Sequence, residues 1–222
     1  MAAWARKAAS NSTPESFGGR GIFGASNGGD FPHIVHISLP IDDFISDRTK
    51  TKQALVQIVD ALTQLDVQKS DQVVLACNTA HLMQPQIERI LGIEITSLVD
   101  SVMAKVIGDK LQNVGVLGSP TTIKSRLFHD VIEKHNITVT APDEQDLEPL
   151  EEIIRSVIAN TVEARTLEKA NTLIDDLKRK GAEKVILGCT ELSTLGLKSS
   201  DTIDPLDEIT SVLLVANHVN NV

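Results

Sequence analysis

The sequence predicts an α/β protein made of two similar domains, each a mostly parallel sheet flanked by helices. Two observations lead to this prediction. Apolar runs rich in β-branched residues, at 73–75 and 185–187, are typical of parallel strands buried on both faces. Each run ends in a cysteine that polar residues follow, in ACNTAH at 76–81 and GCTEL at 188–192. The repeated pattern predicts one such strand and turn in each domain.

Composition agrees with two small cores. The chain has 222 residues and 41% hydrophobic content. We expect an irregular arm over 1–29, because this stretch is rich in Ala, Ser, Gly and Asn and has no sustained apolar period. The first α/β domain is predicted over 30–98 plus 203–222, and the second over 99–202.

Periodicity gives the elements in order. In the first domain it predicts strands at 33–39, 73–75 and 93–98, and helices at 50–65 and 86–91. In the second it predicts strands at 113–117, 137–139 and 185–187, and helices at 99–107, 123–135, from 144 onward and at 167–180. A closing helix is expected at 206–216. Gly92 and Gly181 mark the ends of two of these helices.

The two cysteines are the candidate reactive groups. Cys77 is expected between the carboxyl end of a strand and the amino end of a helix, where oriented amides favour a thiolate. Asn78 and Thr79 are candidate caps for that helix. Cys189 has the same context. The alternative is that both thiols are buried as small hydrophobic groups.

Charge and composition exclude several classes of function. The chain has 21 basic and 30 acidic residues, a net charge of −9, and no basic stripe with interleaved aromatic residues, so we expect no nucleic-acid partner. It has no run of about 18 apolar residues and no signal-type segment, so we expect no membrane insertion. Two cysteines without a disulfide framework favour the cytoplasm.

The ordered pair of cysteine motifs resembles the aspartate/glutamate racemase superfamily, and its aspartate racemase branch in particular. The resemblance runs from about Asp30 to about His218. It implies that Cys77 and Cys189 face each other across the substrate, in a cleft between the two domains. Glutamate racemases carry a histidine at the position of Glu191. The strand, Gly-rich turn and helix that begin most members are not recognisable here.

The resemblance also implies a set of substrate-binding residues. Arg48 matches an arginine that holds the side-chain carboxylate of aspartate, which a guanidinium fork suits. Its alternative is an exposed arginine paired with Asp47 or Asp43. The other predicted substrate-binding residues are Asn78, Thr79, Ser119, Thr122 and Thr190. The alternative for Ser119 and Thr122 is an ordinary turn and helix cap.

Two further residues are candidates for orienting the cysteines. His81 and Glu191 follow the two thiols closely in sequence, and either could equally be structural. The segment before the last helix of the second domain, where the resemblance leads us to expect a lysine, carries Glu163 and Arg165 instead. A second cationic anchor is therefore left open, and with it the choice between aspartate and glutamate.

The function that follows is a cofactor-independent amino-acid racemase. One thiolate removes the α-proton while the other thiol returns a proton to the opposite face. Nucleotide loops, a cofactor lysine motif and metal-ligand spacing are missing from the sequence, so we expect no cofactor and no metal. We expect aspartate as substrate, with glutamate also possible. The alternatives are an isomerase or racemase of the maleate isomerase or hydantoin racemase type, and a member that binds a dicarboxylate without turnover. A homodimer is expected, because it would cover an open sheet edge in the first domain.

Overall fold

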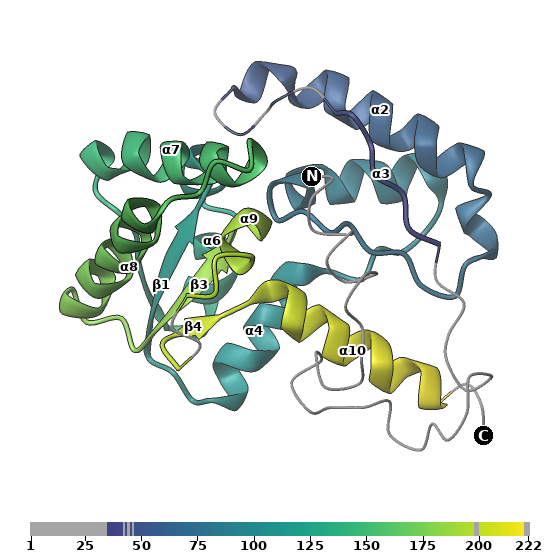
Figure 1. Ribbon diagram of the computed structural model, residues 1–222. Coiled ribbons are helices and arrows are strands. Elements are labelled where there is room, and N and C mark those ends of the chain that lie inside the picture. The colour runs from purple at the N-terminus through teal and green to yellow at the C-terminus, as the bar shows by residue number, and fades with distance from the viewer. Residues whose placement is uncertain (1–34, 42, 44, 46, 198–199, 220–222) are drawn as a thin grey trace, which may run out of the picture.

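The computed structural model describes residues 35–41, 43, 45, 47–197 and 200–219 (Figure 1). The side chains of Arg48 and of residues 213–219 are also outside this description. The irregular arm expected over 1–29 therefore remains a prediction. Within the described residues the chain is α/β, with a parallel sheet flanked by helices as predicted.

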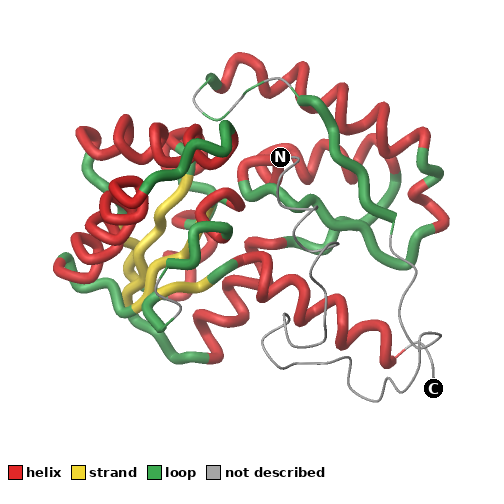
Figure 2. Tube along the Cα trace, viewed as in Figure 1, coloured by secondary structure: helices red, strands yellow, loops and turns green. Residues whose placement is uncertain are grey.

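One four-stranded parallel sheet forms the centre of the second half. Its strands are β1 (Asn113–Gly118), β2 (Thr138–Thr140), β3 (Lys184–Gly188) and β4 (Thr202–Ile203), in the order β2-β1-β3-β4. The register of β1 and β3 pairs Gly118 with Gly188, so both strands end at one edge. Figure 2 shows these strands gathered on one side of the molecule.

Helices cover both faces of this sheet. One face packs on α7 (Leu147–Ile158), α8 (Ala164–Arg179) and α9 (Thr190–Ser193), and the other on α4 (Leu98–Gly108) and α6 (His129–Ile132). The strand residues alternate between the two cores: Leu117 and Val185 belong to the first, and Val116 and Ile186 to the second. Because both faces are covered, the strands are continuous apolar runs.

The first half contains helices but no ladder among its described residues. Its helices are α2 (Thr51–Gln64) and α3 (Gln84–Leu91), with 3-10 segments η3 (Arg48–Lys50), η4 (Val67–Lys69) and η5 (Thr79–Met83). Gly92 ends α3 with φ of 63°, as predicted. Ile58, Met83 and Ile87 form the centre of its core.

The strands predicted for this half are wrong for its described residues. Residues 35–39 have no regular structure, and residues 33 and 34 are outside the description. The segments predicted as strands at 73–75 and 93–98 share a single parallel bridge, Val74 to Thr96, in which the Thr96 amide donates to the Val73 carbonyl at 2.9 Å. Both segments line a groove of about 250 Å³, and the described residues at 35–41 form no bridge with 72–77.

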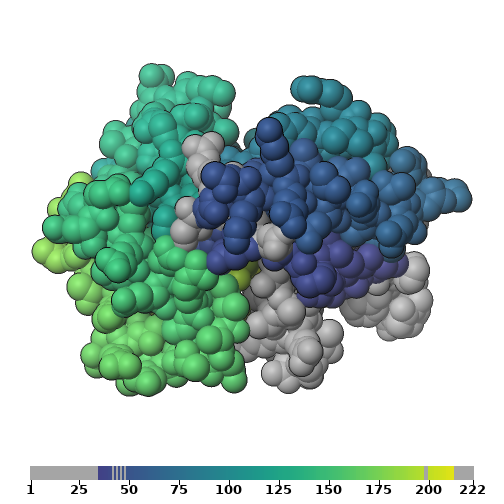
Figure 3. All heavy atoms as spheres, turned by 90° about the horizontal axis from the view of Figure 1, so that it is seen from above, coloured from purple at the N-terminus to yellow at the C-terminus, as the bar shows by residue number. Residues whose placement is uncertain are grey.

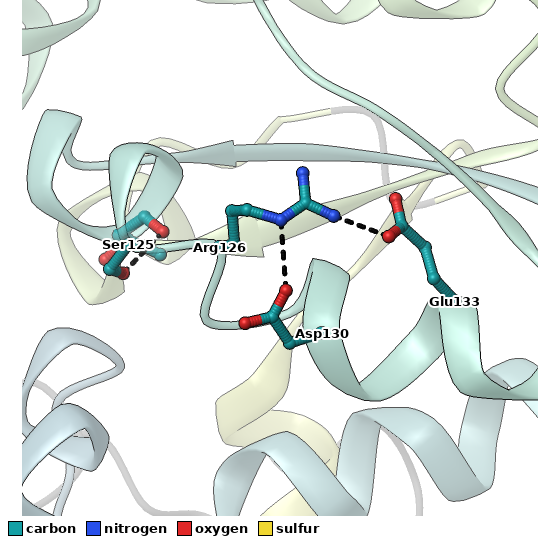
Figure 4. Close-up of polar contacts among 5 residues, drawn as sticks. Ser125, Arg126, Asp130 and Glu133 are labelled. Carbon is teal, nitrogen blue, oxygen red and sulfur yellow. Dashed lines mark hydrogen bonds and ion pairs between the residues drawn. The ribbon is translucent and has the colours of Figure 1, made fainter.

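The helix predicted at 123–135 is broken. The chain instead forms α5 (Pro120–Lys124), then α6, then η6 (Glu133–His135). Arg126 has φ of 59°, a left-handed conformation that a helix cannot include. Its guanidinium pairs with Asp130 and Glu133 across the break (Figure 4). The Ser125 hydroxyl donates to the Thr122 carbonyl at 3.0 Å and closes α5.

A closing helix joins the two halves. α10 (Pro205–Val219) lies beside α4 in Figure 1. Leu98, Leu206 and Ile209 form a small core there, and Val74 of the first half packs against it. The remaining predicted helices and strands are present within a few residues of their expected ends, and η7 (Glu144–Asp146) precedes α7. Within the described residues, helices of the length and apolarity that a membrane span requires are absent.

Candidate active site

Cys77 lies where the first half meets the second. Its amide donates to the Leu75 carbonyl at 2.7 Å, and η5 begins two residues later. Burial raises the pKa of its thiol to about 11, although hydrogen bonds from the amides of Ala80 and Thr79 act in the opposite direction. The amide environment expected from the sequence is therefore present, but it is weaker than the cost of burying a charge.

Cys189 occupies the matching position after β3. It is the N-cap residue of α9 and is buried in the core that covers one face of the sheet. Its thiol donates to Oε2 of Glu191 at 2.9 Å, and the Thr190 hydroxyl donates to the same oxygen at 3.1 Å. Burial raises the pKa of Cys189 well above its ordinary value, and the Glu191 carboxylate raises it further.

The two thiols influence each other electrostatically. After burial and Glu191, a charge on Cys77 is a further cause that raises the pKa of Cys189. After burial, the same carboxylate also raises the pKa of Cys77. These three side chains therefore share one site, in which a negative charge on one disfavours a negative charge on the others.

Three buried hydroxyls connect the halves beside the cysteines. The Thr79 hydroxyl lies 3.1 Å from that of Ser119 and 2.9 Å from that of Thr122, and the Ser119 hydroxyl donates to that of Thr122 at 3.0 Å. The Thr122 amide donates to Ser119, which caps α5. Thr79 and the Ser119–Thr122 loop thus meet, from segments 40 residues apart in sequence.

Asn78 differs from these hydroxyls, because its buried side chain makes no hydrogen bond within the described chain. Its side chain is 1% exposed, and neither its amide nitrogen nor its amide oxygen has a hydrogen-bond partner in the described chain. Each unpaired buried polar group costs about 1–3 kcal/mol. The capping role predicted for Asn78 and Thr79 is wrong, because η5 has no side-chain cap bond. An unpaired amide is available to a ligand.

His81 contacts the main chain. Its Nε2 accepts from the Leu98 amide at 3.1 Å, which leaves the proton on Nδ1 to donate to the Cys77 carbonyl at 2.9 Å. Burial lowers the pKa of His81, so the ring is neutral in this arrangement. The imidazole therefore fixes the backbone of Cys77 against the start of α4.

The cationic anchors are the least defined part of the predicted site. Arg48 begins η3, but its side chain is outside the description, so its role stays a prediction. Asp43 pairs with Arg155 of α7 at 2.8 Å. Arg165 pairs with Glu163 at 2.8 Å on a separate groove of about 520 Å³ between α7 and α8, whose lining includes none of the predicted site residues.

Sequence reasoning missed a connection between the halves, which the described residues 41 and 45 form. Ile41 packs on the core of the first half and Ile45 on that of the second, and the Thr121 amide donates to the Ile45 carbonyl at 3.0 Å. Figure 3 shows the halves as two lobes, blue and teal to green, separated at the upper edge of the view. The signal available in the sequence was the apolar pair Ile41 and Ile45, which indicates contact with a core at each end. Groups of three or more metal-ligating side chains are absent from the described residues.

Known proteins share this architecture. The family model described as Asp/Glu/Hydantoin racemase matches residues 22–218, and thus begins eight residues before Asp30. Picrophilus torridus aspartate racemase superposes with a TM-score of 0.70 at 20% identity, over 86% of this chain and 82% of that one. An aspartate racemase homologue from Pyrococcus horikoshii OT3 gives 0.68 at 22% identity, over 85% and 84%. These neighbours have the two-domain fold.

Two relatives resemble the chain in sequence. The broad specificity amino-acid racemase RacX of Bacillus subtilis (strain 168) is 26% identical over 175 residues, 78% of this chain and 75% of that protein. The glutamate racemase of Deinococcus radiodurans is 31% identical over 156 residues, 68% of this chain and 52% of that protein. The family match covers most of the sequence, and the chain therefore belongs to the Asp/Glu/hydantoin racemase family.

Proposed function

We propose that this amino-acid racemase inverts the α-carbon of aspartate, with glutamate as a second substrate, and that Cys77 and Cys189 are its two acid/base residues. The observation that carries the proposal is that the two cysteine turns meet. The Thr79 hydroxyl, two residues after Cys77, lies 2.9 Å from that of Thr122 beyond the end of β1, and β1 ends level with β3, which Cys189 follows. Glu191 accepts from the Cys189 thiol, and its charge also raises the pKa of Cys77. The only two cysteines of the sequence thus share one charge environment. Both named aspartate racemase neighbours have this fold.

The mechanism needs one thiolate and one thiol. A thiolate takes the α-proton from one face, and the opposing thiol gives its proton to the other face of the carbanion. Mutual repulsion supports this division, since ionisation of one cysteine makes ionisation of the other harder. No organic cofactor has a role in these steps.

The remaining predicted residues stabilise the substrate. The unpaired amide of Asn78 is suited to a carboxylate oxygen, and the hydroxyls of Thr79, Ser119 and Thr122 can exchange a mutual hydrogen bond for one to the substrate. Arg48 is the proposed partner of the side-chain carboxylate. Under this proposal Thr190 also contacts the substrate, and His81 holds the backbone of Cys77 in place.

The domain division, the homodimer and the cytoplasmic location are also proposals. The first domain spans 30–98 plus 203–222 and the second spans 99–202. The packing of Val74 against Leu206 and Ile209 supports placing the closing helix with the first domain, although Ile203 of β4 pairs with β3 of the second. A homodimer would elute at about twice the chain mass of 24.0 kDa in size-exclusion chromatography with light scattering.

The test is α-proton exchange in deuterium oxide. Purified protein is incubated with L-aspartate or L-glutamate, the α-proton is followed by NMR, and enantiomers are separated by chiral chromatography. Cys77→Ser and Cys189→Ser should each lower racemisation at least about a hundredfold, because acid/base groups contribute about 10²–10⁴-fold. Parent-like racemisation by either variant would refute the two-thiol mechanism.

The same assay separates the alternatives. Maleate and a substituted hydantoin test the other two chemistries associated with the superfamily. Binding of L-aspartate without exchange would identify a member that binds a dicarboxylate without turnover.

A further inference from the structure

Asp204 lies where the chain leaves the sheet of the second half. It follows β4 directly and precedes Pro205, the first residue of α10. Its Oδ1 accepts a hydrogen bond from the Ser193 hydroxyl at 2.8 Å and another from the Leu206 amide at 2.9 Å. One carboxylate oxygen therefore joins the end of α9 to the start of α10, and these two helices are in contact (Figure 1).

The contact with α9 leads to Cys189. This helix is a single turn of four residues, and Cys189 is its N-cap residue. The Leu192 amide donates to the Cys189 carbonyl at 3.0 Å, and Ser193 is the last residue of the turn. Because so short a helix has few hydrogen bonds of its own, a bond at its end also restrains its beginning.

The contact with α10 leads to Cys77. Leu206 and Ile209 of α10 form a small core with Leu98, and Val74 of the first half packs against it. Val74 stands three residues before Cys77 in the sequence. The Asp204 carboxylate is therefore connected to the turn of Cys77 through α10, and to the turn of Cys189 through α9.

The second hydrogen bond of this carboxylate exceeds what a helix cap requires. Burial raises the pKa of Asp204 above its ordinary value, although the Leu206 amide and the Ser193 hydroxyl act in the opposite direction. Capping accounts for the bond to Leu206, and a serine or threonine at the same place would satisfy that amide. It does not account for the bond to Ser193, which belongs to another helix.

We propose that Asp204 is a positioning residue for racemisation, which holds the turn of Cys189 at the distance from the turn of Cys77 that inversion requires. The inference rests on the proposed two-thiol function. One thiol must reach the carbanion that the other has formed, so the placement of each turn relative to the other affects the rate. A displacement of about 1 Å at a reacting group can cost about a hundredfold.

Ser193→Ala separates positioning from capping, because it removes the bond to α9 and keeps the bond to Leu206. We expect kcat for L-aspartate, measured by chiral chromatography, to fall about tenfold. KM should change by less than about twofold, because neither Ser193 nor Asp204 is a proposed substrate contact.

Variants of Asp204 test the same bond from its other end. Asp204→Ala should lower kcat at least as much as Ser193→Ala does, and adding Ser193→Ala to it should lower kcat no further, because both changes remove one shared interaction. Asp204→Asn keeps an acceptor oxygen in place and should hold kcat within about threefold of the parent.

A second readout reports on the two thiols directly. L-aspartate and D-aspartate are each incubated in deuterium oxide, and deuterium is measured in the recovered substrate and in the inverted product. For the enantiomer that Cys77 deprotonates, a displaced Cys189 leaves the carbanion longer beside Cys77, which returns deuterium to the original face. The ratio of labelled substrate to inverted product should therefore rise severalfold in Ser193→Ala, for one of the two enantiomers. Lower stability alone would leave this ratio at the parent value.

Controls keep the outcomes separate. Ser211→Ala removes an exposed hydroxyl that donates to the Asp207 carbonyl of α10 at 3.0 Å, and should leave kcat and the ratio at parent values. Parent-like kcat in Ser193→Ala would overturn the inference, and so would a lower kcat with an unchanged ratio, or an Asp204→Asn variant as slow as Asp204→Ala.

A parent chain that exchanges no α-proton would overturn the proposed function, and this inference with it. Circular dichroism at the assay temperature verifies that each variant is folded. The conclusion depends on Ser193→Ala, which keeps the cap of α10 even if Asp204→Ala fails to fold.

Discussion

The two halves of the molecule each present one cysteine turn, but they support it differently. Cys189 follows β3, which pairs with a strand on each side and is covered by helices on both faces. Cys77 follows a segment with one β-bridge, and it lines a groove that opens between 35–41 and 72–77. Equivalent apolar runs precede both cysteines. The comparison teaches that such a run forms a ladder only where neighbouring strands complete it.

The largest difference should appear when the same side chain is shortened in each half. Leu117 is fully buried on β1, so Leu117→Ala should lower the free energy of unfolding by about 3–5 kcal/mol. Leu62 lines the groove and is only partly buried, so Leu62→Ala should cost about 1 kcal/mol. Urea denaturation measures both. Equal losses would contradict the claim that the halves are packed differently.

A glycine pair tests how closely the strands of the second half approach. A Cβ at Gly118 would lie 2.8 Å from the Gly188 carbonyl oxygen, so Gly118→Ala should destabilise the protein by about 2–3 kcal/mol. Gly108 ends α4 with no atom within 4 Å of an added Cβ, so Gly108→Ala should be neutral or stabilising by up to about 1 kcal/mol. Thermal unfolding of both variants is the measurement. Similar melting temperatures would show that the strand ends can separate without cost.

The smallest effect concerns pH. Because burial raises the pKa of Cys77 from 9.0 to about 11, the native state holds its proton where the unfolded state has lost it. This contribution to stability is complete below pH 9 and is lost as pH rises through about 11. After allowance for partial exposure, the loss is about 2 kcal/mol. Cys77→Ala should flatten that part of the pH dependence in urea denaturation, and an unchanged slope would assign it to other groups.

Local sequence patterns predicted most of the second half correctly. The run that became β1, the helix α8 that Gly181 follows, and the strand before Cys189 each form hydrogen bonds within themselves or with a neighbouring element. The break at Arg126 was not predictable, because a left-handed φ of 59° is uncommon for an arginine and no glycine marks the position. The prediction of a strand at 33–39 is wrong over 35–39, because a segment forms a strand only if a neighbouring strand pairs with it, and local sequence does not reveal that neighbour.

The candidate site was predictable in part. Thr79 meets Ser119 and Thr122 in the structure, and the substrate-binding role of these hydroxyls stays a prediction. The capping role of Asn78 was wrong, and nothing in the sequence distinguishes a capping asparagine from a buried and unpaired one. The contact of Glu191 with Cys189 depends on the rotamers of two side chains, which spacing alone does not determine.

The single bridge between Val74 and Thr96 also determines how the site is lost on local unfolding. Among the described residues, one isolated bridge joins this segment to its neighbour, and such a segment opens at a lower free energy than a four-stranded ladder does. Amides around 73–77 should therefore exchange with deuterium before those of β3. Each such opening separates Cys77 from Cys189 while the second half stays folded. Under the proposed two-thiol mechanism, the working lifetime is then set by the less stable of the two supports.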